Sequence, residues 1–280
     1  MDYRPSPIAG TWYPGEETSL ARSIDAFLDA APPQHSSGRL IGLVAPHAGH
    51  RYSGAVAGAA FRMARGLSPE IVAVVSPMHV LAPAAVLTSA HQAYRTPLGD
   101  IPVDREAISA LQESLAAKAG ISLLAIRRDR EHSLEIELPF LQRALGGFRL
   151  LPVMILDQLE ATSEAVGHSL AEVLRGRNAL LVASSDLSHH YSAHIANTLD
   201  AEMMRRIESF QPEAVMRAEE EGVGFACGRA AIAAVLWAAR DLGADRVTVQ
   251  DYATSGDVTG DESDVVGYGA AAIWQSVPPA

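Results

Sequence analysis

The chain has 280 residues, of which 48% are hydrophobic and 20% charged, with one cysteine and a formal net charge of −11 at pH 7. This composition excludes a wholly disordered chain and an intramolecular disulfide scaffold, and no apolar run reaches the ~18 residues of a membrane-spanning helix. An acidic chain without a Lys/Arg cluster repels phosphate backbones, so we expect no nucleic acid as a partner. Since no apolar run is long enough to span a bilayer, we expect no membrane as a partner either. The first residues lack an apolar segment behind a basic start, which predicts a cytoplasmic protein.

Seven short apolar runs along the chain are typical of buried strands: 40–45, 71–76, 85–88, 150–155, 179–184, 247–252 and 265–273. The segments between them have helical periodicity, at 17–30, 53–64, 105–119, 134–145, 159–175, 193–210 and 228–242. Strands rich in Val, Ile and Leu that alternate with helices predict an α/β fold, a three-layer α/β/α sandwich with a largely parallel central sheet. Because no long linker interrupts the pattern, we expect one domain over residues 1–280.

Side chains that can bind metals or transfer protons follow three of these runs. His47 comes after the first run and His79 after the second, and Asp186 and His189 follow the fifth. Cys227, the single cysteine, lies in a Gly-rich turn at a helix start. Ligands of open α/β sheets bind beyond the carboxyl ends of the strands, so the fold makes convergence of these turns plausible. Imidazole and thiolate suit iron, copper or zinc.

Each of these residues also has a simpler interpretation. His47 and His79 could bond backbone carbonyls at the start of a helix or turn, and Cys227 could be a small buried apolar residue. Asp186 could cap the turn that follows it, and His189 could be a surface residue of that turn. His132 lies in a highly charged helix start, where a solvated cap with local ion pairs is favoured over a supporting role at the site.

Eight motifs occur in order along the chain: AGTWYP (9–14), VAPHAG (44–49), YSG (52–54), TPLG (96–99), EHSLE (131–135), SSDLSH (184–189), ACG (226–228) and VGY (266–268). Together they resemble the Memo family, whose bacterial and archaeal members are called AmmeMemoRadiSam system protein B. The resemblance runs from about Arg4 to Trp274. It implies a fold related to that of the class III non-haem iron extradiol dioxygenases.

The resemblance also implies the roles of individual residues. The metal ligands of the family fall on His47, His79 and Cys227, and Asp186 and His189 match a neighbouring polar pair. His189 stands where the related dioxygenases place an acid/base histidine, so the resemblance implies catalytic roles for His189 and Asp186. The residues expected around the cleft, or just behind the ligands, are Trp12, Tyr13, His50, Tyr52, His132 and His190.

Four residues depart from the family pattern. His50 and His190 stand where the family usually has tyrosine. Before His79, Ser76 stands in place of Gly and Met78 in place of Asn or Ser. None of these changes removes an implied ligand. Each could alter the hydrogen bonds around the ligands and thereby the metal affinity.

The resemblance implies a mononuclear transition metal, with iron favoured, then copper, then zinc. A thiolate in place of the dioxygenase carboxylate makes ring cleavage doubtful, so the leading hypothesis is a metal-binding, redox-type protein. The alternatives are a non-catalytic peptide- or protein-binding module with a vestigial metal site, and a zinc-dependent hydrolase. Expected partners are a small molecule or peptide in the cleft, a second copy in a homodimer, and pathway links to a radical S-adenosylmethionine protein and an AMMECR1-domain protein.

Overall fold

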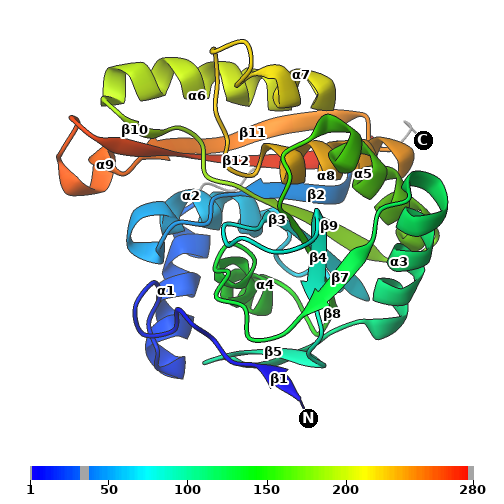
Figure 1. Ribbon diagram of the computed structural model, residues 1–280. Coiled ribbons are helices and arrows are strands. Elements are labelled where there is room, and N and C mark those ends of the chain that lie inside the picture. The colour runs from blue at the N-terminus through cyan, green and yellow to red at the C-terminus, as the bar shows by residue number, and fades with distance from the viewer. Residues whose placement is uncertain (1, 32–37, 277–280) are drawn as a thin grey trace.

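The computed structural model describes residues 2–31 and 38–276, which are built around one large mixed sheet (Figure 1). The strand order is β10-β12-β2-β9-β3-β8-β4-β7, and β11 pairs with β12. The strands are β2 (Arg39–Ala45), β3 (Ile71–Pro77), β4 (Val86–Ser89), β7 (Leu123–Ile126), β8 (Arg149–Ile155), β9 (Ala179–Ser184), β10 (His189–Tyr191), β11 (Arg246–Thr254) and β12 (Val265–Gln275).

The centre of this sheet is parallel, and the strands on either side of the centre run antiparallel to it. Strands β2, β9, β3 and β8 run parallel, with Ala45 opposite Ser184 and Val75 opposite Ala183. On the flanks, β12 is antiparallel to β2, and β4 is antiparallel to β8. The carboxyl ends of β2, β9 and β3 therefore lie side by side at one edge of the sheet.

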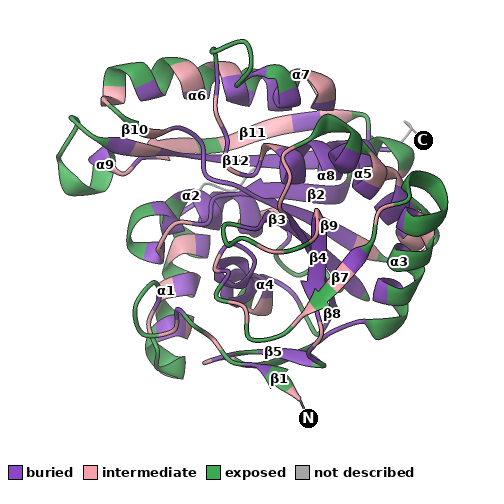
Figure 2. Ribbon diagram, in the orientation of Figure 1, coloured by how far each residue is buried: buried purple, intermediate pink, exposed green. Residues whose placement is uncertain are grey.

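Helices cover both faces of the sheet, which confirms the three-layer α/β/α sandwich predicted from the sequence. One face carries α1 (Glu17–Ala30), α2 (His50–Arg62) and α4 (Leu138–Ala144). The other carries α3 (Arg105–Ala119), α5 (Glu160–Leu174), α6 (Ala193–Glu208), α7 (Pro212–Arg217) and α8 (Arg229–Asp241) (Figure 1). Strands β2, β3 and β9 are buried between these layers (Figure 2).

Local sequence explains why the longer helices form where they do. The Glu16 side chain accepts the backbone N–H groups of Thr18 and Ser19 and so caps α1, whose residues Leu20, Ile24 and Leu28 form one buried stripe. In the other layer α5 packs closely on α8 at Gly167. A Cβ at Gly167 would lie 2.7 Å from the carbonyl oxygen of Ala234.

The sequence did not predict the shortest elements. These are the three-stranded sheet β1 (Tyr3–Arg4), β5 (Ala93–Thr96) and β6 (Gly99–Pro102), together with β7, β10, α7 and α9 (Gly256–Thr259). The segment predicted as a helix at 134–145 begins as a 3-10 turn, η1 (Glu135–Glu137), before α4. Pro139 lies in the first turn of α4, where its missing N–H has no intrahelical partner to lose.

Among the described residues, no helix combines the length and apolar character needed to cross a membrane.

Candidate metal centre

Turns from four distant parts of the sequence meet at the carboxyl edge of β2, β9 and β3. His47 follows β2, His79 follows β3 and Asp186 follows β9, and these strands are neighbours in the sheet. Cys227 precedes α8, and its backbone N–H donates to the carbonyl oxygen of Asp186 at 3.2 Å. Parallel strands direct their carboxyl-end turns to the same edge, which explains how residues 180 positions apart become neighbours.

The side chains of His47, His79 and Cys227 form a compact group. One nitrogen or sulfur atom from each lies within 4.8 Å of the others. The Cys227 Sγ is 3.2 Å from the Nε2 of His47. His47 is 2% exposed and Cys227 is partly buried, whereas His79 is exposed on the cleft side of the group. The group is thus accessible from one side.

A hydrogen bond to Ser184 holds the imidazole of His47 in place. Its Nδ1 lies 3.0 Å from the Oγ of Ser184, the last residue of β9, which leaves Nε2 facing Cys227. Burial, followed by the nearby His79 and His132 rings, lowers the pKa of His47 well below its ordinary value. Burial also raises the pKa of the Cys227 thiol. These shifts favour neutral His47 and Cys227 when no metal is bound.

Glu131 holds the second imidazole. Its Oε1 lies 2.9 Å from the Nδ1 of His79, and its Oε2 accepts the His79 backbone N–H at 2.5 Å. The backbone N–H groups of His132 and Ser133 donate to Oε1, both at 2.9 Å. Burial opposes the charge of Glu131, but these hydrogen bonds and the His79 ring outweigh it and hold the pKa of Glu131 well below its usual range. Sequence reasoning missed Glu131, although it directly precedes His132 in the EHSLE motif.

A second group of ligand-type atoms shares His79 with the first. Atoms of His79, Glu131 and His132 also lie within 4.8 Å of one another. Both oxygens of Glu131 already accept N–H groups from this segment and from His79, so this group is a hydrogen-bonded support for His79. His132 is partly buried and lines the cleft, rather than standing as a solvated cap, and burial lowers its pKa to about 4.

Asp186 joins two of the turns. Its Oδ1 accepts the backbone N–H groups of His47 at 2.7 Å and Ala48 at 3.2 Å, so it caps the turn after β2 rather than the turn that follows it in sequence. Burial raises its pKa to about 7, although these two N–H donors act in the opposite direction. Asp186 also lines the cleft.

His189 also lines the cleft. Its Nδ1 is 2.8 Å from the carbonyl oxygen of Leu187, a pure acceptor, so Nδ1 carries the proton and Nε2 is left bare. Burial lowers the pKa of His189, which keeps the ring neutral.

The cleft above this group has a volume of about 910 Å³. It is lined by Thr11, Trp12, His47, Ala48, Gly49, Arg51, Tyr52, His79, His132, Asp186, His189, Ser255, Thr259, Asp261, Asp264, Val266 and Tyr268. Trp12 and Tyr52 are 37% and 38% exposed, and the Trp12 ring centroid lies 4.3 Å from that of His132. Two large apolar rings at the mouth suit a ligand with an aromatic or apolar part.

Three of the residues expected around the cleft or just behind the ligands do not line the cleft. Tyr13 is buried with its hydroxyl donating to Glu135 at 2.7 Å, and its ring stacks on His50 at 5.3 Å between ring centroids. His50 is buried, with its Nε2 3.2 Å from the carbonyl oxygen of Ile136. His190 is exposed and pairs with Asp264 at 3.0 Å.

A glycine lets the cysteine turn approach β9 closely. A Cβ on Gly228 would lie 2.5 Å from the carbonyl oxygen of Ser184 and 2.9 Å from the Cβ of Ser185. The Ser185 Oγ in turn accepts the Gly228 N–H at 2.9 Å. Only glycine fits this approach, and it brings Cys227 to His47.

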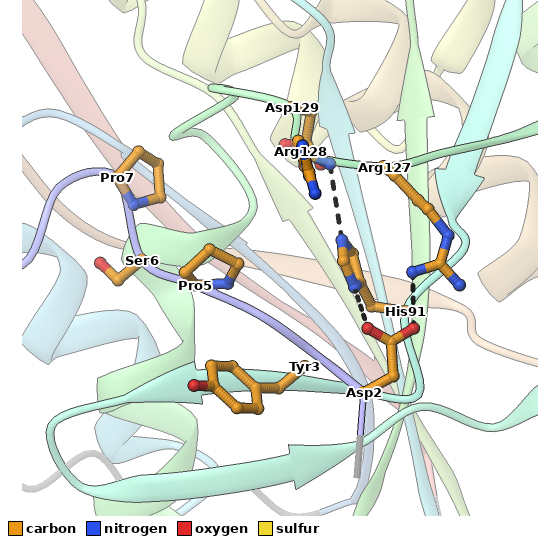
Figure 3. A pocket seen from close by; sticks show the side chains of 9 residues that line it. All are labelled: Asp2, Tyr3, Pro5, Ser6, Pro7, His91, Arg127, Arg128 and Asp129. Atoms are coloured by element: carbon orange, nitrogen blue, oxygen red, sulfur yellow. Dashed lines mark hydrogen bonds and ion pairs between the residues drawn. The ribbon is translucent and has the colours of Figure 1, made fainter.

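A second hollow lies at the N-terminal end of the chain (Figure 3). Three of the side chains on its wall are joined: Asp2 accepts from Arg127 at 2.7 Å and lies 3.0 Å from the Nδ1 of His91. Asp129, also on its wall, binds the buried guanidinium of Arg4. These pairs fasten the N-terminal segment to the loop before Glu131.

The sequence matches one family model. The model described as Memo-like protein matches residues 4–272. The chain belongs to the Memo family. This assignment confirms the resemblance found in the eight motifs.

Curated relatives match the chain over nearly its whole length. A MEMO1 family protein of Aeropyrum pernix is 36% identical over 286 residues, covering 98% of this chain and 100% of the relative. One from Nitrosopumilus maritimus is 33% identical over 269 residues, covering 94% and 96%. Among solved structures, the uncharacterized protein JW3007 of Escherichia coli K12 aligns with a TM-score of 0.47 and 14% identity, covering 82% of this chain and 99% of that one.

Proposed function

We propose that the protein binds one transition metal ion through His47, His79 and Cys227 and that it has a redox-type function, with iron favoured and copper next. The observation that carries the proposal is the pairing of the Cys227 Sγ with the Nε2 of His47 at 3.2 Å, in a group that also includes His79. Histidines and cysteines that were buried only to fill the core would have no reason to lie this close to one another. The donor set, two imidazoles and one thiol, belongs to the soft-to-borderline class that binds iron, copper and zinc.

The spacing of the donors supports the fit. In a tetrahedral site with metal–nitrogen distances of about 2.1 Å and a metal–sulfur distance of about 2.3 Å, a nitrogen and a sulfur ligand lie about 3.6 Å apart. The separation between His47 and Cys227 is 3.2 Å, so a small movement accommodates an ion. Metal-binding histidines commonly donate their second N–H to a carboxylate or another oxygen, as His79 does to Glu131, and the Nδ1 of His47 lies within hydrogen-bond distance of the Ser184 hydroxyl.

The metal would supply Lewis acidity and, in the case of iron or copper, one-electron redox chemistry. The residues around it have separate tasks. His189, with its Nε2 bare, would accept a proton from a ligand in the cleft, and Asp186 would hold the turn that carries His47. Trp12 and Tyr52 would hold the apolar part of a small molecule or peptide and exclude water from it.

Two other functions fit particular features of the same site. A Cys/His donor set is chemically adequate for zinc, which favours a hydrolase. The broad cleft with Trp12 and Tyr52 at its mouth would also suit a peptide-binding module with a vestigial metal site. The bound metal and its dependence on the three donors separate these functions.

The test is the metal content of protein purified without oxygen, measured by mass spectrometry for the wild type and for His47→Ala, His79→Ala and Cys227→Ala. His168→Ala is the matched control, because His168 is exposed and pairs with Asp241 away from the site. Stoichiometric iron or copper that is lost in the three site variants and kept in the control supports the proposal. Zinc in its place favours the hydrolase, and a metal-free wild type that still binds peptide overturns the metal-site proposal.

The remaining expectations stay predictions: one domain over residues 1–280, a cytoplasmic location, a homodimer, and pathway links to a radical S-adenosylmethionine protein and an AMMECR1-domain protein. Light scattering after size-exclusion chromatography tests the homodimer. Co-purification with each of the two pathway proteins tests the links.

A further inference from the structure

Glu137 is a carboxyl group buried behind His47. It ends the 3-10 turn η1, and its exposed fraction is 0%. Its Oε1 lies 2.6 Å from the Oγ of Ser184, and its Oε2 is buried without a hydrogen-bond partner. Among residues 2–31 and 38–276, Glu137 forms no ion pair, whereas nearby Glu135 pairs with Arg4. An ionised carboxylate in this place would lack both a cation and a full set of donors.

Ser184 has more neighbours than its single hydrogen can serve. Its Oγ lies 2.6 Å from the carbonyl oxygen of Ser133, 2.6 Å from the Oε1 of Glu137 and 3.0 Å from the Nδ1 of His47. The carbonyl oxygen can only accept, so the hydroxyl hydrogen of Ser184 must point at Ser133. The two lone pairs of Ser184 then require hydrogens from the other two neighbours.

We infer that Glu137 is a neutral carboxylic acid that donates a hydrogen bond to Ser184, and that this Glu137–Ser184–His47 chain positions His47 with its proton on Nδ1 and with Nε2 bare. Glu137 is thus a positioning residue, which acts through Ser184. The consequence for metal binding rests on the proposed function, whereas the protonation state of Glu137 can be tested without metal.

The ionised alternative leaves two polar contacts unsatisfied. If the Ser184 hydroxyl donated to a Glu137 carboxylate, the oxygens of Ser184 and Ser133 would face each other at 2.6 Å with no hydrogen between them. The charge would also leave Oε2 buried without a donor, and an unpartnered charge is far costlier in the interior than a neutral carbonyl oxygen.

The groups around Glu137 act in the same direction. Burial raises the pKa of Glu137 well above its ordinary value, and the hydrogen bond with Ser184 only partly opposes this. The charge of Asp186 raises it further, and no arginine or lysine is among the groups that shift it. A neutral Glu137 also supplies the hydrogen that one lone pair of the Ser184 hydroxyl requires.

The two glutamates behind the metal ligands thus differ in protonation state. Glu131 is an ionised acceptor for the ring of His79, and Glu137 is a neutral donor to the serine that holds His47. Both leave one ring nitrogen of the histidine available to the shared site. A neutral Glu137 also spares the site a buried negative charge that no partner balances.

The variants that test this inference are Glu137→Gln and Glu137→Met. Glutamine keeps the shape and can donate an amide N–H to Ser184, whereas methionine is of similar length and cannot donate. We expect Gln to preserve the chain and Met to break it. Circular dichroism and the ¹⁵N resonances of His79 and His132 check that both variants are folded.

The first measurement uses the metal-free protein. The infrared spectrum of the wild type at neutral pH should contain a carboxylic-acid C=O band above the amide region, which shifts on ¹³C-glutamate labelling and is absent from Glu137→Gln. The ¹⁵N spectrum of His47, assigned with His47→Ala, should show the Nδ1–H tautomer in the wild type and in Glu137→Gln. Absence of the band from the wild type, or the opposite tautomer of His47, overturns the inference.

The second measurement is the affinity for Co²⁺ added as the free metal without oxygen. We expect Glu137→Gln to stay within about threefold of the wild type and Glu137→Met to bind about 10–100-fold more weakly. Equal losses in both variants overturn the positioning role. If the wild type itself binds no Co²⁺, the proposed function fails, and the infrared band and the tautomer alone decide the inference.

Discussion

Gly228 offers a direct test of how closely the cysteine turn must approach β9. In Gly228→Ala the new Cβ would lie 2.5 Å from the Ser184 carbonyl oxygen, whereas ordinary contacts begin at 3.4 Å. The turn that carries Cys227 must therefore retreat by about 0.9 Å, several times the ~0.2 Å tolerance of metal–ligand distances. Overpacking of this kind costs about 1–3 kcal/mol of folding free energy, so we expect the variant to fold.

The assay is titration with Co²⁺ without oxygen, followed through the thiolate-to-cobalt absorption band. We expect Gly228→Ala to lose at least about tenfold in affinity, as changes just behind metal ligands commonly do. The matched control is Gly147→Ala, since a Cβ at Gly147 would meet nothing within 4 Å. Wild-type affinity and an unchanged band in Gly228→Ala would refute the reasoning that this close approach positions Cys227.

Two further predictions concern the cleft and the fold. Because the Trp12 ring lies 4.3 Å from that of His132, Cu²⁺ binding should quench Trp12 fluorescence. Trp12→Phe should remove most of that quenching, and equal quenching in the variant would place the metal elsewhere. Asp104 caps α3 through the Ala107 N–H at 2.9 Å and pairs with Arg177 at 3.1 Å. Burial acts against these partners, but they hold the pKa of Asp104 below 3.8, so its stabilising contribution exists above pH 3.8 and is lost as the pH falls through its folded pKa. Asp104→Ala should cost about 1 kcal/mol in urea unfolding at neutral pH and less near pH 3, and a pH-independent loss would contradict this sign.

Much of the candidate site could be predicted because its residues follow strong local patterns. The apolar runs that end before His47, His79 and Asp186 were identifiable as buried strands, and the α/β architecture determines at which edge their turns lie. The placement of Cys227 depends on a turn before α8, where composition alone favoured a small buried residue. The family resemblance supplied what the local pattern could not.

The residues that hold the metal ligands in place could not be predicted from local sequence patterns. Ser184, Glu131 and Glu137 act through hydrogen bonds to residues between 47 and 137 positions away, and a single sequence gives no signal for such pairings. Tyr13 illustrates the converse, since it neighbours Trp12 in a motif yet turns into the interior toward Glu135. The short strands β5 and β6 were missed because they depend on pairing with each other and with β1 rather than on local periodicity.

The most direct test of the central claim is X-ray absorption spectroscopy of the protein loaded with one equivalent of Fe²⁺ without oxygen. Binding through His47, His79 and Cys227 predicts one sulfur scatterer at about 2.3 Å and imidazole nitrogen scatterers at about 2.1 Å, with the sulfur lost in Cys227→Ser. A shell of oxygen and nitrogen without sulfur in the wild type would contradict the claim that these three side chains form the metal centre.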